Sequence, residues 1–210
     1  MKQYSGSGVI PIIIIDNKPY FVLFYLKKNI VTDAGGKIEY NNSVLNTASR
    51  ELFEESAGLI NISESTLDFN SFYIDIKNED KYYRSYIVII DSININIDDY
   101  YKNLNKINKF KFNPFSETHG IRLISLDYID FINNDIIMHT NADKIVILSK
   151  RTKHIIKKIY NKFDDFKIFF KKISKSLNPI KLNKTIISTE SYEYTSKKKI
   201  KINDLITYIN

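Results

Sequence analysis

The sequence predicts an α/β fold with a basic, mainly helical C-terminal extension. Three observations support this prediction: apolar, strand-like runs in the first half of the chain, an amphipathic helix with an acidic face at residues 44–57, and a sharp change of charge near Asp143. Residues 1–143 hold 14 Lys/Arg and 19 Asp/Glu, whereas residues 144–210 hold 17 and 5. Net charge therefore changes from −5 to +12, which marks 1–143 as a core and 144–210 as an extension packed on or following it.

The composition excludes several classes of protein. A hydrophobic content of 43% in 210 residues is enough to form a core, so global disorder is not expected. Cysteine is absent, which rules out a disulfide framework, thiolate catalysis and cysteine-based zinc sites. The apolar run at 9–15 is far too short to span a bilayer, and no signal-peptide pattern surrounds it. We therefore expect a cytoplasmic protein without membrane contact.

Strands are predicted in two pairs. The β-branched run 8–15 and the apolar run 20–28 predict a hairpin through Asp16–Pro19, and Pro11 suggests an edge strand or a bulge. Residues 67–76 and 82–93 predict two more strands joined by a polar turn. Residues 98–110 are expected to be helical or irregular. A further strand is expected at 121–126.

The predicted helix at 44–57 presents two different faces. One is an apolar stripe at helical spacing, formed by Leu45, Ala48 and Leu52. Beside it lie three carboxylates, Glu51, Glu54 and Glu55, which repel one another at these spacings. One interpretation is a solvated acidic face. The other is a site for a hard divalent cation, Mg²⁺ or Mn²⁺, which prefers oxygen ligands.

The segment from Gly35 to Gly58 resembles the Nudix box, G-x5-E-x7-R-E-U-x-E-E-x-G-U, in which U is apolar. Six residues match the box in type and spacing: Gly36, Arg50, Glu51, Leu52, Glu54 and Glu55. Two positions depart from it, because Asn42 replaces a glutamate and Ala57 a glycine. Gly58 follows one place later and could close the helix instead.

The resemblance implies a fold, a reaction and a set of site residues. The fold is an α/β/α sandwich with a mixed central sheet. The reaction is hydrolysis of a diphosphate linkage in a nucleoside diphosphate derivative, with Mg²⁺ or Mn²⁺ as cofactor. The implied metal ligands are the Gly35 carbonyl, Glu51, Glu54 and Glu55. Glu54 is favoured as the general base, with Glu117 as the alternative base. Arg50 orients a glutamate.

The position of Asn42 weakens one contact that the resemblance implies. The family glutamate there is thought to brace the box arginine, whereas Asn42 offers Arg50 a hydrogen bond without a charge. Glu39, three residues upstream, could substitute for it. Because of Asn42, the alternative function is a Nudix-fold binding module with weak or no catalysis that recognises a nucleotide or RNA.

Substrate contacts are less specific. Lys37, His119 and Arg122 are candidates for contact with a substrate phosphate, although an exposed lysine or a solvated loop histidine fits the same pattern. Residues 143–175 predict helix with the apolar positions Ile145, Leu148, Ile155, Ile159 and Phe163 roughly on one side. The lysines of 144–175 form either a solvated face or a surface for RNA or another polyphosphate, which raises RNA decapping as one activity.

Overall fold

The computed structural model describes most of the chain before residue 175. Described are residues 2–15, 18–26, 30–90, 99–100, 102–103, 120–126, 129–132, 135–139, 145–174, 191–195 and 198–202. Two predicted site residues, Glu117 and His119, lie outside this part of the chain, as does most of the segment 98–110.

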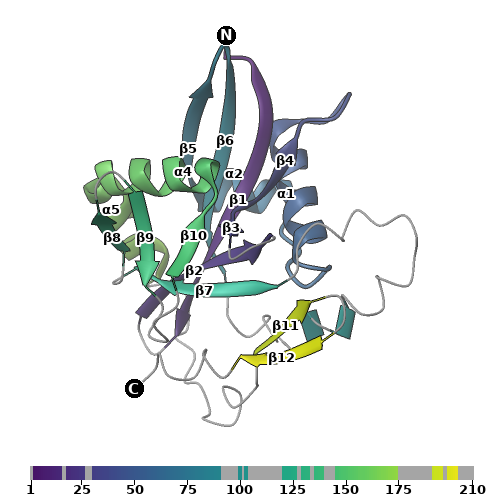
Figure 1. Ribbon diagram of the computed structural model, residues 1–210. Coiled ribbons are helices and arrows are strands. Elements are labelled where there is room, and N and C mark those ends of the chain that lie inside the picture. The colour runs from purple at the N-terminus through teal and green to yellow at the C-terminus, as the bar shows by residue number, and fades with distance from the viewer. Residues whose placement is uncertain are drawn as a thin grey trace.

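Ten of the described strands form one mixed sheet (Figure 1). Its main path runs β5-β6-β1-β2-β3-β10-β9-β8, while β4 pairs with β1 and β7 pairs with β2. The strands are β1 (Tyr4–Ile15), β2 (Lys18–Tyr25), β3 (Ile30–Thr32), β4 (Ala34–Lys37), β5 (Ser71–Asn78), β6 (Lys81–Ile89), β7 (Ile121–Ser125), β8 (Ile129–Ile132), β9 (Asp135–His139) and β10 (Ile145–Leu148). A separate pair consists of β11 (Ser191–Thr195) and β12 (Lys198–Ile202).

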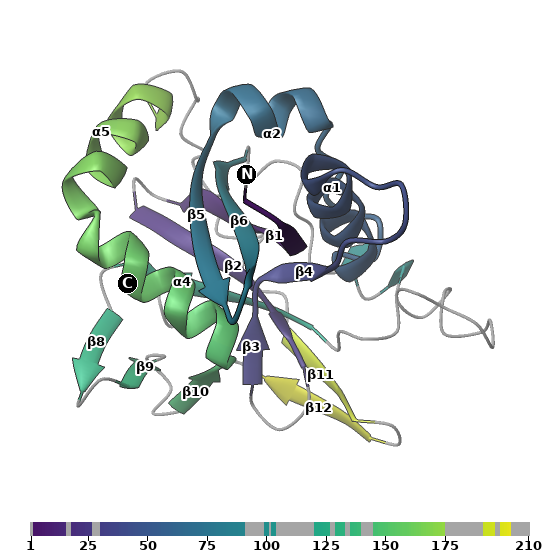
Figure 2. The same ribbon diagram turned by 90° about the horizontal axis from the view of Figure 1, so that it is seen from above.

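Helices cover both faces of the sheet, as Figure 2 shows. One side carries α1 (Val44–Glu55) and α2 (Glu64–Asn70), and the other carries α4 (Lys150–Asn161) and α5 (Phe163–Ser174). The expected α/β/α sandwich with a mixed sheet is thereby confirmed. None of the described helices is both long and apolar enough to cross a membrane.

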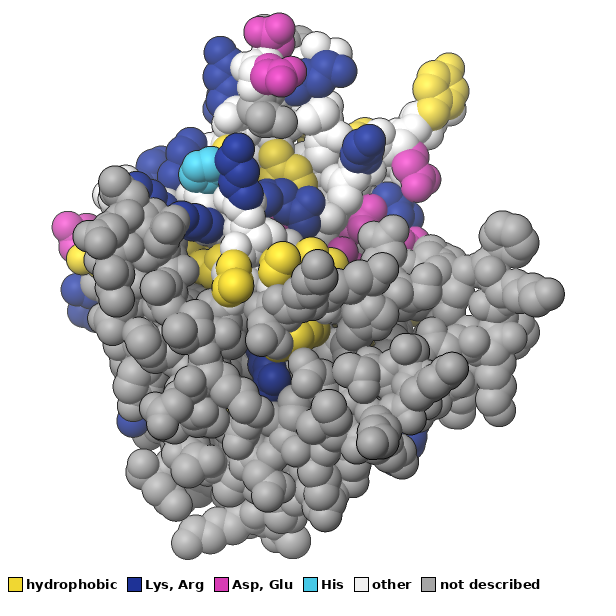
Figure 3. Space-filling model, viewed as in Figure 1, with side chains coloured by type: hydrophobic (Ala, Val, Ile, Leu, Met, Phe, Trp, Pro, Cys, Tyr) yellow, Lys and Arg dark blue, Asp and Glu magenta, His cyan; other side chains and the backbone are white. Residues whose placement is uncertain are grey.

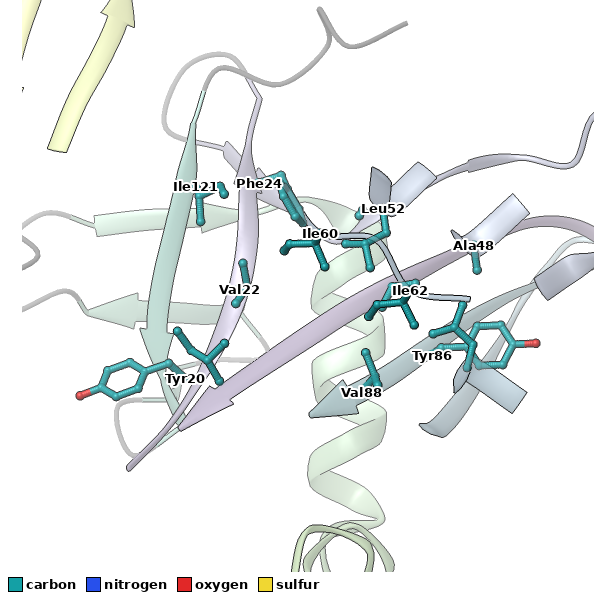
Figure 4. Packing of buried hydrophobic residues seen from close by; sticks show 14 of the residues in the cluster. Tyr20, Val22, Phe24, Ala48, Leu52, Ile60, Ile62, Tyr86, Val88 and Ile121 are labelled. Carbon is teal, nitrogen blue, oxygen red and sulfur yellow. The ribbon is translucent and has the colours of Figure 1, made fainter. Parts of the chain in front are cut away.

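Strand residues alternate between two apolar cores, because successive side chains of a strand point to opposite faces. In β1 and β2, Ile10, Ile12, Phe21 and Leu23 belong to the core beneath α4 and α5. The second core contains their neighbours together with Ala48 and Leu52 of α1, as Figure 4 shows. The apolar stripe predicted for this helix is thus the face that holds it on the sheet, and burying a leucine-sized side chain stabilises the fold by about 2 kcal/mol.

The prediction from Pro11 was wrong, since β1 is neither an edge strand nor bulged at that residue. β1 has β6 on one side, and on the other it pairs with β4 through residues 6–9 and with β2 through residues 12–15. Pro11 lies where β1 changes from one partner to the other. A residue without an N–H is tolerated there, because no antiparallel ladder bond is required of it.

Two other predictions need correction. Residues 67–70 are the end of α2 rather than strand, since Ser63 caps a short helix by accepting a hydrogen bond from the Thr66 N–H at 3.2 Å. Ile145 and Leu148 lie in β10 rather than on a helix. β10 pairs in parallel with β3, so the chain after Asp143 contributes a strand to the core sheet. Whether 144–210 forms a separate unit stays a prediction.

Candidate active site

A glycine pair at the end of β4 brings the sheet against α1. Gly35 and Gly36 pair with Gly8 and Ser7 of β1. A Cβ atom on Gly36 would overlap the Glu51 carboxylate, and one on Gly35 would overlap the Tyr83 hydroxyl. A side chain at Gly35 would also collide with the backbone of β1, whereas one at Gly36 would displace the Glu51 carboxylate from its present place.

The helix α1 has defined caps at both ends. Ser43 caps its start by accepting a hydrogen bond from the Asn46 N–H at 2.9 Å. After its end, Ala57 and Gly58 both adopt left-handed backbone conformations, with φ of 54° and 75°. Gly58 closes the helix as predicted, by donating to the Phe53 carbonyl at 2.8 Å. Ala57, at the position of the box glycine, nonetheless adopts a conformation that disfavours a Cβ atom.

Arg50 links two of the box glutamates. Its Nη2 donates to Glu51 Oε1 at 2.8 Å, and its Nη1 donates to Glu54 Oε2 at 2.9 Å. The Glu51 and Glu54 side chains are only 13% and 17% exposed. Burial lowers the pKa of Arg50, but Glu51, Glu54 and Glu39 outweigh burial and raise it above its ordinary value. Arg50 therefore holds two carboxylates together that would otherwise repel each other.

Glu39 takes part in this bracing and Asn42 does not. Glu39 Oε1 lies 3.6 Å from Arg50 Nη2, as the sequence suggested for a substitute of the missing box glutamate. Within the described chain, the Asn42 side chain forms no hydrogen bond with Arg50, and Arg50 Nε is a buried donor without an acceptor. The arginine is thus braced less completely than a box with glutamate at this position would allow.

Glu55 points to the interior rather than to Arg50. Its side chain is buried, and burial, with the nearby Asp33 carboxylate as second cause, raises its pKa to about 9, against the lowering effects of Arg151 and of a hydrogen bond from the Gly35 backbone. Burial therefore favours the neutral form of the Glu55 carboxyl where no divalent cation is bound.

Asp33 is the centre of a second polar cluster beside the box. Its carboxylate is fully buried and accepts hydrogen bonds from Tyr83 Oη at 2.7 Å, Thr152 Oγ1 at 2.8 Å and Arg151 Nε at 2.9 Å. Arg151 Nη2 also donates to the Gly35 carbonyl at 2.9 Å. These contacts exist because β10 pairs with β3, which sets the first turn of α4 against the residue that follows β3.

The sequence analysis did not single out Asp33, Tyr83, Arg151 or Thr152. Asp33 belongs to no motif of the sequence, and Arg151 lies in a lysine-rich segment that predicts helix. One signal was present, since only four of the 31 basic residues are arginines. Arginine forms several directed hydrogen bonds where lysine forms a point contact, so a rare arginine is a better candidate for a buried polar cluster.

The remaining predicted substrate residues lie apart from each other. Lys37 is exposed at the end of β4, one residue after Gly36. Arg122 of β7 lies over the Tyr25 ring, with its guanidinium carbon 5.0 Å from the ring centroid. The structure therefore brings Lys37, but not Arg122, next to the box.

The donor atoms suit a hard divalent cation, although they do not converge as a group of three. The oxygens of Glu51 and Glu54 and the Gly35 carbonyl are of the chemical type that Mg²⁺ and Mn²⁺ prefer. Among the residues that the structure describes, no three His, Cys, Asp or Glu side chains lie close enough to form a metal site. Magnesium commonly binds through one or two carboxylates together with substrate phosphates, and Glu51 and Glu54 fit that arrangement.

Comparison with known proteins gives matches among solved structures only. No protein-family model and no curated protein matches this chain. A MutT/nudix family protein from Enterococcus faecalis has a TM-score of 0.47 and 14% identity, covering 79% of this chain and 64% of its own. A mutT/nudix family protein from Listeria innocua has a TM-score of 0.42 and 13% identity, covering 80% and 99%. An Ap4A hydrolase from C. elegans has a TM-score of 0.31 and 16% identity, covering 41% and 65%.

Nudix proteins thus stand among the structural neighbours of this chain, as the box predicts. The chain spans just under two thirds of the Enterococcus and C. elegans proteins. The functional interpretation therefore depends on the residues of the box and on their placement beside the Gly35–Gly36 pair of β4.

Proposed function

We propose that the protein is a Mg²⁺- or Mn²⁺-dependent hydrolase of a diphosphate linkage in a nucleoside diphosphate derivative. The observation that carries this proposal is the pairing of Glu51 and Glu54 by Arg50 beside Gly36. Arg50 offsets only one of the two negative charges, so the carboxylate pair keeps a net negative charge that a divalent cation would neutralise. The glycine pair of β4 permits close approach of a ligand, since it carries no side chain.

The residues of the chain have distinct roles in this reaction. Glu51 and Glu54 would hold the divalent ion, with the Gly35 carbonyl and Glu55 as further predicted ligands; when bound, the ion neutralises phosphate charge and acidifies water. Glu54 would accept a proton from the water that attacks phosphorus as the diphosphate P–O bond breaks, and Glu117 remains the alternative base. Arg50 is a positioning residue, because it contacts the two carboxylates.

The proposal is tested with a panel of diphosphates in the presence of Mn²⁺. The panel contains nucleotide sugars, dinucleoside polyphosphates, oxidised nucleotides, capped RNA and diphosphoinositols. Glu54→Gln should lower the turnover of an accepted substrate by about 100-fold or more, because the amide removes both the base and an anionic ligand. The matched control is Glu79→Gln in the exposed β5–β6 turn, which should retain wild-type turnover. Wild-type turnover by Glu54→Gln, or no turnover of any compound, would refute the proposal.

The second candidate is a binding module that recognises a nucleotide or RNA without cleaving it. Two observations favour it: Arg151 donates to the Gly35 carbonyl, which is a predicted metal ligand, and burial favours the protonated form of Glu55. This function predicts saturable binding of a panel compound and no product after prolonged incubation with excess Mn²⁺.

A further inference from the structure

A basic cavity lies beside the glycine pair of β4, between the sheet and the start of α4. Its volume is about 490 Å³, and its lining includes Gly36 of the box. Five of the lining residues carry basic side chains and come from β4, β5 and α4: Lys37, Lys77, Lys150, Arg151 and His154. No aspartate or glutamate is among the described residues that line it. Figure 3 shows a histidine side chain bordered by lysine and arginine side chains on this face.

The three lysines of this cavity form no ion pair within the described chain, whereas Arg151 is paired with Asp33. These lysines are Lys37, Lys77 and Lys150. Cations converging on one hollow repel one another, and walls of low dielectric constant strengthen the field inside it. An anion with several charges would relieve this repulsion.

Arg151 differs from the lysines because it is fixed in place. Its Nε and Nη2 are engaged by Asp33 and Gly35, and its guanidinium carbon lies 4.7 Å from the centroid of the Tyr83 ring. Among the described residues, Nη1 has no hydrogen-bond partner. A guanidinium that is already oriented loses little conformational entropy when it binds an anion, so it is suited to anchor a phosphate.

The cavity and the box share Gly36. This residue lines the cavity, and a Cβ atom on it would overlap the Glu51 carboxylate. A ligand in the cavity would therefore contact the β4 residue that also adjoins Glu51, with its phosphates among the lysines of the lining.

We infer that the cavity binds the phosphate groups of a small, compact substrate with three or more phosphates. The inference rests on the proposed function for the bond that is cleaved, but the binding itself requires no catalysis. The volume lies in the range of small-molecule sites. The open surface of α4 and α5 would suit RNA, whereas basic side chains that come from three different elements around one hollow favour a compact polyanion.

The test measures binding of inorganic triphosphate by isothermal titration calorimetry, in EDTA and in the Glu54→Gln background. Under these conditions neither metal nor turnover contributes. Triphosphate should bind at least about tenfold more tightly than monophosphate, and Lys77→Ala/Lys150→Ala should weaken triphosphate binding about tenfold or more. The matched control removes two exposed lysines outside the cavity, Lys18→Ala/Lys171→Ala, and should change the affinity less than about twofold.

Each outcome of the calorimetry supports or overturns the cavity as a phosphate-binding site. Equal weakening by the two double variants would mean that only net charge matters, and it would overturn the cavity as a site. Absence of triphosphate binding at millimolar concentration would overturn it too, as would binding of 5′-triphosphorylated RNA but not of triphosphate. Failure of the hydrolase proposal leaves this binding experiment unaffected, so the two failures can be told apart. Circular dichroism of each variant confirms that the fold is retained.

Discussion

The site contains two arginine-centred clusters of opposite design. Arg50 bridges carboxylates one and four residues further along the same helix, on a partly open surface. Arg151 reaches across 118 residues of sequence to Asp33, which is fully buried. The first cluster gathers negative charge that a cation could use, whereas the second neutralises a buried acid and fixes the strand–helix junction. The comparison shows that the same residue type makes local contacts along one helix in one place and joins distant parts of the chain in the other.

The largest difference in stability is expected between variants that lack the arginine of one cluster or of the other. Arg151→Met leaves the Asp33 carboxylate buried without its cation, which should lower the free energy of unfolding by about 3 kcal/mol. Arg50→Met, at a partly exposed pair, should lower it by about 1 kcal/mol or less. Urea unfolding of both variants measures the two values. Equal losses of unfolding free energy in the two variants would contradict the difference between the buried and the partly exposed cluster.

A third arginine, Arg84, is paired with Asp75, and the stability that this pair contributes depends on pH. Burial raises the pKa of Asp75, but hydrogen bonds from Arg84, Lys2 and Tyr4 outweigh burial and lower the pKa to about 2. Because this is below the value of 3.8 for an unperturbed aspartate, ionised Asp75 stabilises the fold above about pH 4, and this contribution is lost as the pH falls towards 2.

The stability difference between wild type and Asp75→Asn should therefore shrink by about 1–2 kcal/mol between pH 5 and pH 2. Chemical unfolding at several pH values measures it. A difference that stays constant with pH would show that the Arg84–Asp75 pair does not depend on charge.

Restoring the box glutamate at position 42 should change the free energy of unfolding by a smaller amount. Asn42→Glu offers an acceptor for the buried Nε of Arg50 and should stabilise the fold by about 1 kcal/mol. The neutral control is Asn42→Gln, which should be close to wild type. The gain should vanish in an Arg50→Met background, and a gain that persists there would show that the introduced carboxylate acts elsewhere.

The smallest effect is expected at the end of α1. Ala57 has a φ of 54°, so Ala57→Gly should relieve strain and stabilise the fold by about 0.5–1 kcal/mol. The same substitution inside the helix, Ala48→Gly, should be destabilising by about 1 kcal/mol or more. Thermal unfolding compares the two, and a loss of stability in Ala57→Gly would contradict the assignment of strain.

The box cluster could be predicted from the sequence because its contacts are local. Arg50 and Glu54 are four residues apart on one helix, so their spacing alone indicates that they meet. Asp33 and Arg151 meet only because β10 pairs with β3, and that pairing was hidden by an apolar run that fits helix and strand alike. The prediction of helix at Ile145 and Leu148 failed for the same reason, and the basic cavity could not be foreseen without this pairing.

Metal binding by Glu51 and Glu54 is tested most directly by electron paramagnetic resonance of Mn²⁺, with methylenediphosphonate as a diphosphate that cannot be hydrolysed. We predict that the wild type binds Mn²⁺ with the diphosphonate at least about tenfold more tightly than Glu51→Gln/Glu54→Gln does. Glu79→Gln, the control outside the box, should match the wild type. Equal Mn²⁺ affinity in the wild type and the double variant would contradict a metal role for the acidic face of α1.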